Sequence, residues 1–348
     1  MVVFRPRTGP GTGLTRVALG SFPTPFEPAP RLSAALGGPP VFIKREDLSG
    51  LALGGNKTRQ AEALFAAAIE AGADTVLATA AAQSNFCRTV AAAGAKLGLE
   101  VHLLLRGEKS LPVTGNLLLD ALLGAHVEFI PTRDAYDPAI AARLNEIMTR
   151  LLSAGRRPHL LHMNGAAAIR GAASYIPMAE ELQDQFRAAG LRPAALYLVA
   201  SSGLTAAGLL AGFSALGEPI RIMGICAQTP PAFLHPRILQ RASEAAELMG
   251  LDISVRSDDV ELDGACLGPG YGIPDAETVA AIELAARTEG LILDPTYTGK
   301  AMAGMVKHMR SGRWRDAGAI VFLHSGGAPG LFAGGSELLA KAHDGRTT

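Results

Sequence analysis

The sequence predicts an α/β protein of two domains, with parallel sheets covered by helices on both faces and an active site in the cleft between the domains. Short apolar segments of strand length alternate with longer segments of helical periodicity along most of the chain, an order that joins parallel strands through crossover helices. The chain also has 348 residues, of which 48% are apolar, so it is long enough to build two cores.

The expected elements follow this alternation. Residues 1–40 are rich in proline and glycine and lack sustained periodicity, so we expect them to wrap the surface. A first helix should start at Lys57, because apolar residues recur at helical spacing from Ala61 to Ile69 before Gly72 ends the pattern. Strands are expected at Val41–Lys44, Thr75–Ala78, Val101–Leu105, Val127–Ile130, His159–His162, Leu196–Val199, Ile220–Ile225 and Ala319–His324. Further helices are expected at Phe86–Leu97, Gly115–Leu123, Pro138–Leu152, Thr205–Leu216, Asp275–Thr288 and Gly299–Ser311.

Composition narrows the classes of partner. The 32 basic and 32 acidic residues cancel and are interspersed, so we expect a small-molecule partner and no nucleic acid. The apolar stretch from Leu204 to Leu216 is too short to cross a bilayer, and the N-terminus lacks the apolar core of a signal peptide, so no membrane association is expected. Cys87, Cys226 and Cys266 are far apart and no histidines cluster at metal-ligand spacing, which favours neither disulfides nor a metal and suggests a cytoplasmic protein.

A lysine at the first predicted helix start is the leading candidate for chemistry. Lys57 follows directly on Gly54, Gly55 and Asn56. The positive end of the helix dipole disfavours an ammonium there, which would lower the pKa of the lysine and help it act as an amine nucleophile. A solvated lysine in a capped turn explains so short a motif equally well, so other features must decide.

Two polar turns follow predicted strands, where the loops of an open α/β sheet converge on a ligand. The run Gln83-Ser84-Asn85 offers uncharged hydrogen-bonding groups, although serine and asparagine are also ordinary helix caps. The run from Ser201 to Thr205 combines hydroxyls with the amides of a helix N-terminus, which suits a phosphate dianion. The glycine patterns of triphosphate and dinucleotide loops are missing, so a cofactor with a single phosphate is favoured.

Together with three later motifs, these segments resemble the family of D-cysteine desulfhydrase and aminocyclopropane-carboxylate deaminase. The resemblance runs in order from about Ser21 to Phe332. The motifs that carry it are Lys44–Arg59, Gln83–Asn85, Gly268–Pro274, Leu293–Ala301 and His324–Gly327. It implies fold type II of the pyridoxal-phosphate enzymes, which is like tryptophan synthase β, with pyridoxal 5'-phosphate as cofactor, a small amino acid as substrate and a homodimer. We expect residues 1–56 and 166–348 to form the large cofactor-binding domain and residues 57–165 the small domain.

The resemblance also implies roles for single residues. Lys57 looks like the Schiff-base lysine and Asn85 like the residue that bonds the cofactor's phenolic oxygen. The four residues that resemble the phosphate cup are Ser202, Gly203, Leu204 and Thr205. Ser84, Tyr271 and Tyr297 resemble groups around the substrate, where hydroxyls and phenols assist proton movements.

The partner of the cofactor's pyridine nitrogen separates the two branches of that family. In the deaminase branch, the residue after the second tyrosine is a glutamate with this role, whereas this chain has Thr298. The desulfhydrase branch places a hydroxyl residue in the turn after the last strand, and Ser325 fits that position. A neutral partner suits β-elimination, in which the leaving group drains electrons from the carbanion, better than ring opening, which needs a deeper electron sink.

Some residues depart from the family's pattern beside the substrate. Phe86 and Cys87 replace a histidine and an aliphatic residue, and residues 165–171 read Gly-Ala-Ala-Ala-Ile-Arg-Gly. Arg88 and Arg170 either bind a substrate carboxylate or sulfonate, which would favour a cysteate sulfo-lyase, or are exposed surface arginines. Leu204 also replaces a smaller residue in the cup, which works through backbone amides and so tolerates the change.

The expected function is a pyridoxal-phosphate lyase of the D-cysteine desulfhydrase type. It would remove the α-proton of a small amino acid, expel a β-substituent such as sulfide, and release pyruvate and ammonia. L-cysteate sulfo-lyase, 1-aminocyclopropane-1-carboxylate deaminase and amino-acid racemase are the enzymatic alternatives. A non-catalytic amino-acid sensor is the alternative from another class, and it predicts loss of the lysine or of the phosphate cup, both of which this chain keeps.

Overall fold

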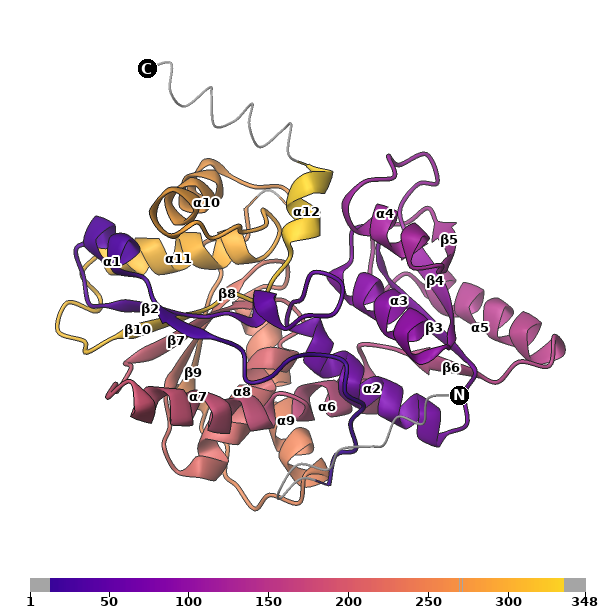
Figure 1. Ribbon diagram of the computed structural model, residues 1–348, viewed down its shortest axis with the longest axis horizontal. Coiled ribbons are helices and arrows are strands. Elements are labelled where there is room, and N and C mark those ends of the chain that lie inside the picture. The colour runs from indigo at the N-terminus through magenta and orange to yellow at the C-terminus, as the bar shows by residue number, and fades with distance from the viewer. Residues whose placement is uncertain (1–12, 269, 271, 335–348) are drawn as a thin grey trace.

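The computed structural model describes residues 13–268, 270 and 272–334, which fold into two α/β units side by side (Figure 1). The larger sheet has the order β1-β2-β10-β7-β8-β9, and the smaller sheet has the order β5-β4-β3-β6. All neighbouring strands are parallel except β1 and β2, which pair antiparallel. The strands of the larger sheet are β1 (Phe26–Pro28), β2 (Val41–Lys44), β7 (Ala195–Ala200), β8 (Arg221–Cys226), β9 (Val260–Asp263) and β10 (Ile320–Leu323). Those of the smaller sheet are β3 (Thr75–Ala81), β4 (Glu100–Arg106), β5 (His126–Ile130) and β6 (Pro158–Leu161).

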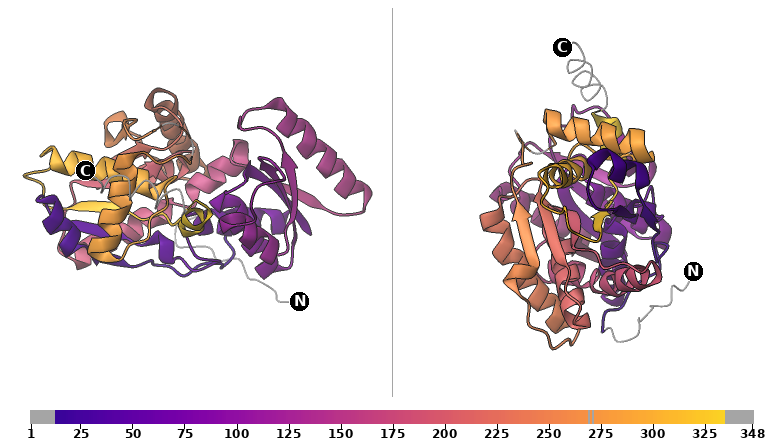
Figure 2. Two further views of the ribbon diagram at one scale, coloured as in Figure 1. Left: turned by 90° about the horizontal axis from the view of Figure 1, so that it is seen from above. Right: turned by 90° about the vertical axis from the view of Figure 1, so that its left-hand side faces the viewer.

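Helices cover both faces of each sheet, because the central strands, such as β7 and β10, are apolar on both sides. One face of the larger sheet packs on α6 (Gly165–Ala173), α7 (Ile176–Ala188), α8 (Leu204–Leu216) and α9 (Pro231–Leu248). Its other face packs on α1 (Pro30–Leu36), α10 (Ala276–Glu289) and α11 (Thr298–Arg310). The smaller sheet lies between α2 (Lys57–Glu70), α3 (Asn85–Leu97) and α4 (Gly115–Leu122) on one face and α5 (Pro138–Ser153) on the other. Viewed from above, α5 lies on the side away from the larger unit (Figure 2).

The predicted α/β class with parallel sheets is confirmed, and the predicted strands and helices lie within three residues of the observed ones. The expectation that the chain before residue 41 only wraps the surface was wrong for its described part. There β1 pairs with β2, and α1 buries Leu32 and Leu36 against the larger sheet. Both elements are too short to show a periodicity in the sequence.

Besides α1, four helices were not predicted from the sequence: α6, α7, α9 and the short α12 (Ala328–Ala333). In α6, five of nine residues are alanine, so the buried and exposed faces have nearly the same hydrophobicity. In α9, Pro236 lies inside the helix, where proline usually argues against one. Helix α7 begins with Ile176 and Pro177 and buries Leu182 and Phe186. Among the described residues, no helix is long and apolar enough to cross a membrane.

Candidate active site

A cavity of about 270 Å³ lies between the two units, at the carboxyl ends of their parallel strands. Ala81 and Arg106 at the ends of β3 and β4 line it from the smaller sheet, and Ser201 after β7 and Ser325 after β10 line it from the larger sheet. This is where open α/β sheets bind ligands. Of the predicted site residues, the cavity brings together Lys57, Ser84, Asn85, Ser202, Gly203, Leu204, Thr205, Tyr297 and Ser325. Tyr271 lies outside the described residues.

Two glycines shape the turn that delivers Lys57 to the cavity. Gly54 has a φ of 65°, and a Cβ there would lie 2.0 Å from the carbonyl oxygen of Asp47. Gly55 has a φ of 110°, and a Cβ there would lie 3.1 Å from the carbonyl oxygen of Ser325. Both positions therefore require glycine, because a side chain would be strained and would meet fixed backbone.

Asn56 ties this turn to the other parts of the cavity. Its amide donates to the carbonyl oxygen of Ser325 at 3.0 Å, and its side-chain Nδ2 donates to Thr205 Oγ1 at 3.1 Å. The hydroxyl of the buried Tyr175 donates to the carbonyl oxygen of Asn56 at 2.8 Å. Lys57, the start of α8 and the turn after β10 are thereby held as one rigid group, although about 270 residues separate their ends in the sequence.

The surroundings of Lys57 change its acidity. Desolvation by burial lowers the pKa of Lys57 to about 8, so roughly a tenth of the amines are neutral at pH 7, far more than for a lysine of ordinary pKa. Lys44 and Lys300 are more deeply buried than the half-buried Lys57, but Lys44 binds Glu181 and Lys300 Nζ donates to the carbonyl oxygen of Leu267 at 2.6 Å. Among the described residues that line the cavity, Lys57 is the one lysine. Its amine is suited to act as a nucleophile or base.

The start of α8 fits a phosphate group. Gly203 caps the helix with a φ of 80°, and a Cβ there would lie 2.7 Å from Ile238 Cγ1. The first amides of an α-helix have no partner within the helix, and here Gly203, Leu204 and Thr205 face the cavity. On the outer side, Arg241 donates to the carbonyl oxygen of Ser202 and adds positive charge. The donors and charges match a single phosphate dianion.

Ser84 and Asn85 stand at the start of α3. Ser84 Oγ caps the helix by accepting from the amides of Phe86 and Cys87 at 3.1 and 3.2 Å, so the capping role considered from the sequence exists alongside its place in the cavity wall. Asn85 Oδ1 accepts from Nδ2 of Asn116 at 3.0 Å. Since its oxygen is engaged, the amide nitrogen of Asn85 is the group left to donate to a ligand.

Asn116 was missed by the sequence reasoning, although it fixes the predicted site residue Asn85 and the neighbouring Gln83. It is fully buried, its Nδ2 also donates to the carbonyl oxygen of Gln83 at 3.0 Å, and its amide donates to Gln83 Oε1 at 2.8 Å. The sequence signal that could have pointed to Asn116 is the glycine before it, Gly115. The structure shows that this glycine is required, because its φ is 55° and a side chain there would meet Gln83. A required glycine beside an asparagine marks a turn built for close approach.

Arg88 and Arg170 do not line the cavity, and both predictions for Arg88 were wrong. Arg88 is neither exposed nor at the substrate. It is fully buried, and it donates to the carbonyl oxygens of Ala52 and, at 2.9 Å, Gly54, so it braces the turn before Lys57. Arg170 lies half-buried on α6, near His159.

The arginines that do line the cavity are Arg106, Arg237 and Arg241. Arg241 is occupied by Ser202, and Arg237 donates to the hydroxyl of Tyr136 at 3.0 Å. Arg106 differs because its Nη1 is buried without a hydrogen-bond partner among the described residues. A charged donor with an unused hydrogen attracts an anionic ligand group.

The described residues that line the cavity include no aspartate or glutamate. Thr298 does not line it either, because its hydroxyl donates to Asp294 Oδ1 at 2.7 Å inside the protein. The buried Asp294 carboxylate accepts from three amides at the start of α11 and so is used as a cap. Ser325 does line the cavity, next to Gly326, and offers a neutral hydroxyl.

His324 and Cys87 are buried outside the cavity lining, whereas His162 and Phe86 form part of its wall. Burial raises the pKa of the Cys87 thiol and lowers the pKa of His324, so both stay neutral near pH 7. On the cavity side, the start of α3 thus presents the aromatic ring of Phe86 and not the thiol of Cys87.

Comparisons with known proteins agree with this geometry. The family model described as pyridoxal-phosphate dependent enzyme matches residues 17–326. The chain is 37% identical to a 1-aminocyclopropane-1-carboxylate deaminase of Burkholderia multivorans, over 89% of this chain and 94% of that one. It is 39% identical to a D-cysteine desulfhydrase of Klebsiella pneumoniae, over 92% of this chain and 97% of that one. A solved structure titled as an ACC deaminase homologue superposes with a TM-score of 0.85 at 34% identity, covering 94% of this chain and 97% of its own.

Proposed function

The chain belongs to the family of pyridoxal-phosphate dependent enzymes and uses pyridoxal 5'-phosphate, and on that premise we propose that it catalyses α,β-elimination on a small amino acid. In the form typified by D-cysteine, water and the substrate give pyruvate, ammonia and sulfide. The Cα–H and Cβ–S bonds break, the sulfur leaves with the bonding electrons, and water later releases the nitrogen as ammonia.

The residues that would hold the cofactor surround the cavity. The start of α8, from Ser202 to Thr205, would bind its phosphate, Lys57 would bind its carbonyl carbon, and Asn85 would donate to its phenolic oxygen. When bound, the cofactor supplies an electron sink for negative charge at the substrate's α-carbon.

The protein's own groups would then move protons. As a neutral amine with a pKa of about 8, Lys57 is the base for the α-proton. Ser84 keeps a hydroxyl hydrogen to donate while its oxygen caps α3, which suits it to hold the substrate carboxylate. Tyr297 lines the cavity and is proposed to deliver a proton, and we assign the same task to Tyr271 on the family resemblance alone.

The observation that carries elimination over ring opening is the absence of a carboxylate among the described cavity-lining residues. A pyridine nitrogen in this cavity would face the neutral hydroxyl of Ser325, and a neutral partner leaves a weaker electron sink. Elimination of a good leaving group requires a weaker electron sink than cleavage of a carbon–carbon bond of a cyclopropane ring.

A substrate panel tests this proposal. The cofactor-loaded protein is incubated with D-cysteine, L-cysteate, β-chloro-D-alanine and 1-aminocyclopropane-1-carboxylate, and pyruvate, 2-oxobutyrate, sulfide and sulfite are measured. We expect pyruvate from at least one β-substituted amino acid, with kcat/KM above that for the cyclopropane substrate. The highest kcat/KM for 2-oxobutyrate formation would identify a deaminase, and racemisation without pyruvate would identify a racemase.

Arg106 favours a second candidate, an L-cysteate sulfo-lyase that releases sulfite. Its side chain lines the cavity, and its buried Nη1 has no hydrogen-bond partner among the described residues, which suits a sulfonate because a charged hydrogen bond contributes about 1.5–3 kcal/mol. Arg106→Met would then lower kcat/KM for L-cysteate about 10- to 100-fold and leave β-chloro-D-alanine nearly unchanged. An equal loss for both substrates would assign Arg106 to the substrate carboxylate or to packing.

The remaining proposals rest on the family resemblance. We propose residues 57–165 as the small domain, since the smaller sheet and the start of α2 fall within them, and residues 1–56 with 166–348 as the large domain. We further propose a homodimer and a cytoplasmic location. A sensor without turnover is disfavoured by the presence of both Lys57 and the phosphate site, and any pyruvate formation in the panel would exclude it.

A further inference from the structure

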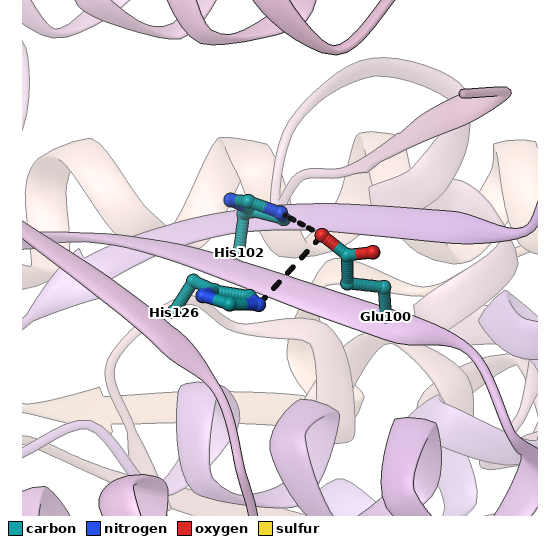
Figure 3. Close-up of side chains that lie close together, drawn as sticks. All are labelled: Glu100, His102 and His126. Carbon is teal, nitrogen blue, oxygen red and sulfur yellow. Dashed lines mark hydrogen bonds and ion pairs between the residues drawn. The ribbon is translucent and has the colours of Figure 1, made fainter. Parts of the chain in front are cut away.

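Three potential metal ligands meet on the smaller sheet, far from the cavity. Glu100 and His102 lie on β4, and His126 is the first residue of β5 (Figure 3). His102 and His126 are direct neighbours in the parallel register, and Glu100 precedes His102 by two residues, which places all three side chains on one face. They stand at the amino ends of their strands, opposite the edge that carries the cavity.

The three side chains converge on a single oxygen atom. Glu100 Oε1 lies 2.7 Å from His102 Nε2 and 3.7 Å from His126 Nε2, and the candidate ligand atoms all lie within 4.8 Å of one another. The two imidazole rings stack with centroids 4.7 Å apart (Figure 3). A tetrahedral ion with bonds of about 2.0–2.2 Å needs ligand atoms about 3.3 Å apart, which is within the observed range of separations.

The second oxygen of the carboxylate has a separate partner. Glu100 Oε2 forms an ion pair with Arg156 Nη2 at 2.6 Å, and Arg156 Nε lies 3.5 Å from Asp74 Oδ1. This contact fixes the orientation of the carboxylate and leaves Oε1 for the histidines. It corresponds to the outer hydrogen bonds that orient carboxylate ligands in metal sites.

We propose that Glu100, His102 and His126 bind a divalent transition-metal ion, with Zn²⁺ as the preferred probe and solvent in the fourth position. Two imidazoles and one carboxylate suit zinc, nickel and copper, whereas calcium and magnesium prefer all-oxygen sites. To bind the ion, the carboxylate shifts away from the two Nε2 atoms, and His126, whose side chain is 62% exposed, turns toward the ion. His102 is 12% exposed and holds the site on the sheet.

The ion would link β4 to β5 and stabilise the smaller sheet, because a ligand bound only by the folded state adds to its stability. Since the two histidines are 24 positions apart in sequence, the spacing argument that predicted no metal site missed them. The inference does not depend on the proposed function, and we expect turnover to be unaffected by the loss of the ion.

Zinc binding to the full, cofactor-loaded chain without an affinity tag tests the proposal, by titration calorimetry and by thermal unfolding with Zn²⁺ or with a chelator. We expect one equivalent to bind, and the midpoint of unfolding to rise by about 3–8 °C at saturation. His126→Ala, at an exposed position that should not disturb folding, should weaken binding at least about tenfold and remove most of the rise. His235→Ala on α9 is the matched control and should behave like wild type.

Two results would overturn the proposal. One is zinc affinity of the His126→Ala protein equal to wild type, which would place the ion elsewhere. The other is the lack of a saturable heat and of a thermal shift in the wild-type protein, which would leave the three side chains as a hydrogen-bonded cluster at the sheet edge.

Discussion

The two walls of the cavity are built in different ways. The cofactor wall, defined as residues 56–57, 201–205 and 325–326 with the turn at Gly54 and Gly55 behind it, is held mainly by backbone groups and by glycines that admit no side chain. The substrate wall, defined as residues 84–86 and Arg106 with the buried Asn116 behind them, consists of side chains, and its Asn85, which we also propose to contact the cofactor, is oriented by Asn116. A backbone wall cannot be altered by most substitutions and suits a constant group such as a phosphate. A side-chain wall allows substrate preference to change by single substitutions.

The largest difference between the walls should appear on removing the amine of the cofactor wall. Lys57→Ala should abolish the visible absorbance of the lysine-bound cofactor and lower kcat by about 10²–10⁴-fold or more, because the base is lost. Spectra and steady-state pyruvate formation measure both effects. Lys300→Ala offers no control because Lys300 is buried and bonded, so Lys307→Ala on the exposed side of α11 is preferable. Retained absorbance in Lys57→Ala would contradict the assignment.

A smaller loss is expected from a side chain added to the phosphate site. Gly203→Val should raise the Kd of pyridoxal phosphate roughly 10- to 100-fold, because the new side chain is strained at a φ of 80° and meets Ile238. Gly217→Val at the other end of α8 is the matched control, since its φ is 65° and no atom lies within 4 Å of its Cβ position. Equal losses in both variants would mean that backbone strain alone, and not the phosphate site, was measured.

Cofactor capture should depend on pH through Lys57. Its pKa is lowered to about 8, so the neutral fraction grows about tenfold per unit below pH 8 and levels off above it. The same shift makes the protonated lysine unfavourable in the folded state at lower pH. We measure the rate at which added cofactor develops visible absorbance and divide it by the rate with a free lysine derivative at the same pH. We expect the rate with the protein to level off near pH 9, so that this ratio falls at higher pH. A ratio unchanged up to pH 10 would show that the amine has an ordinary pKa.

The smallest effect is expected on the substrate wall at Asn116. Asn116→Leu should reduce turnover about three- to tenfold, because Asn85 loses the hydrogen bond that orients its amide. If Asn116 acts through Asn85, the double variant with Asn85→Ala should be no slower than Asn85→Ala alone. Additive losses would show that Asn116 acts independently, through the folding of α4.

The cofactor wall could be predicted from the sequence, because its parts are local. Gly54 to Lys57 and Ser202 to Thr205 each form a short turn next to a helix start, and their spacing is visible without knowing the fold. The order of the strands then implied that these turns meet at one edge. Their mutual hydrogen bonds, such as that from Asn56 to Ser325, followed from that meeting.

The substrate wall could not be predicted to the same depth. Arg88 contacts backbone 34 to 36 residues away, and Asn116 contacts a side chain 31 residues away. No local pattern encodes such pairs, so an arginine that braces a turn resembled one that binds a ligand. Arg106 follows an apolar strand and became a candidate only when the ends of β3 and β4 were seen to border the cavity.

The central claim is that Lys57 holds the cofactor, and locating the cofactor on the chain tests it most directly. The cofactor-loaded protein is reduced with borohydride, digested and examined by mass spectrometry for the lysine that carries the phosphopyridoxyl group. We predict a single modified peptide with the group on Lys57. Modification of Lys44 or Lys300, the fully buried lysines among the described residues, with Lys57 unmodified, would contradict the account.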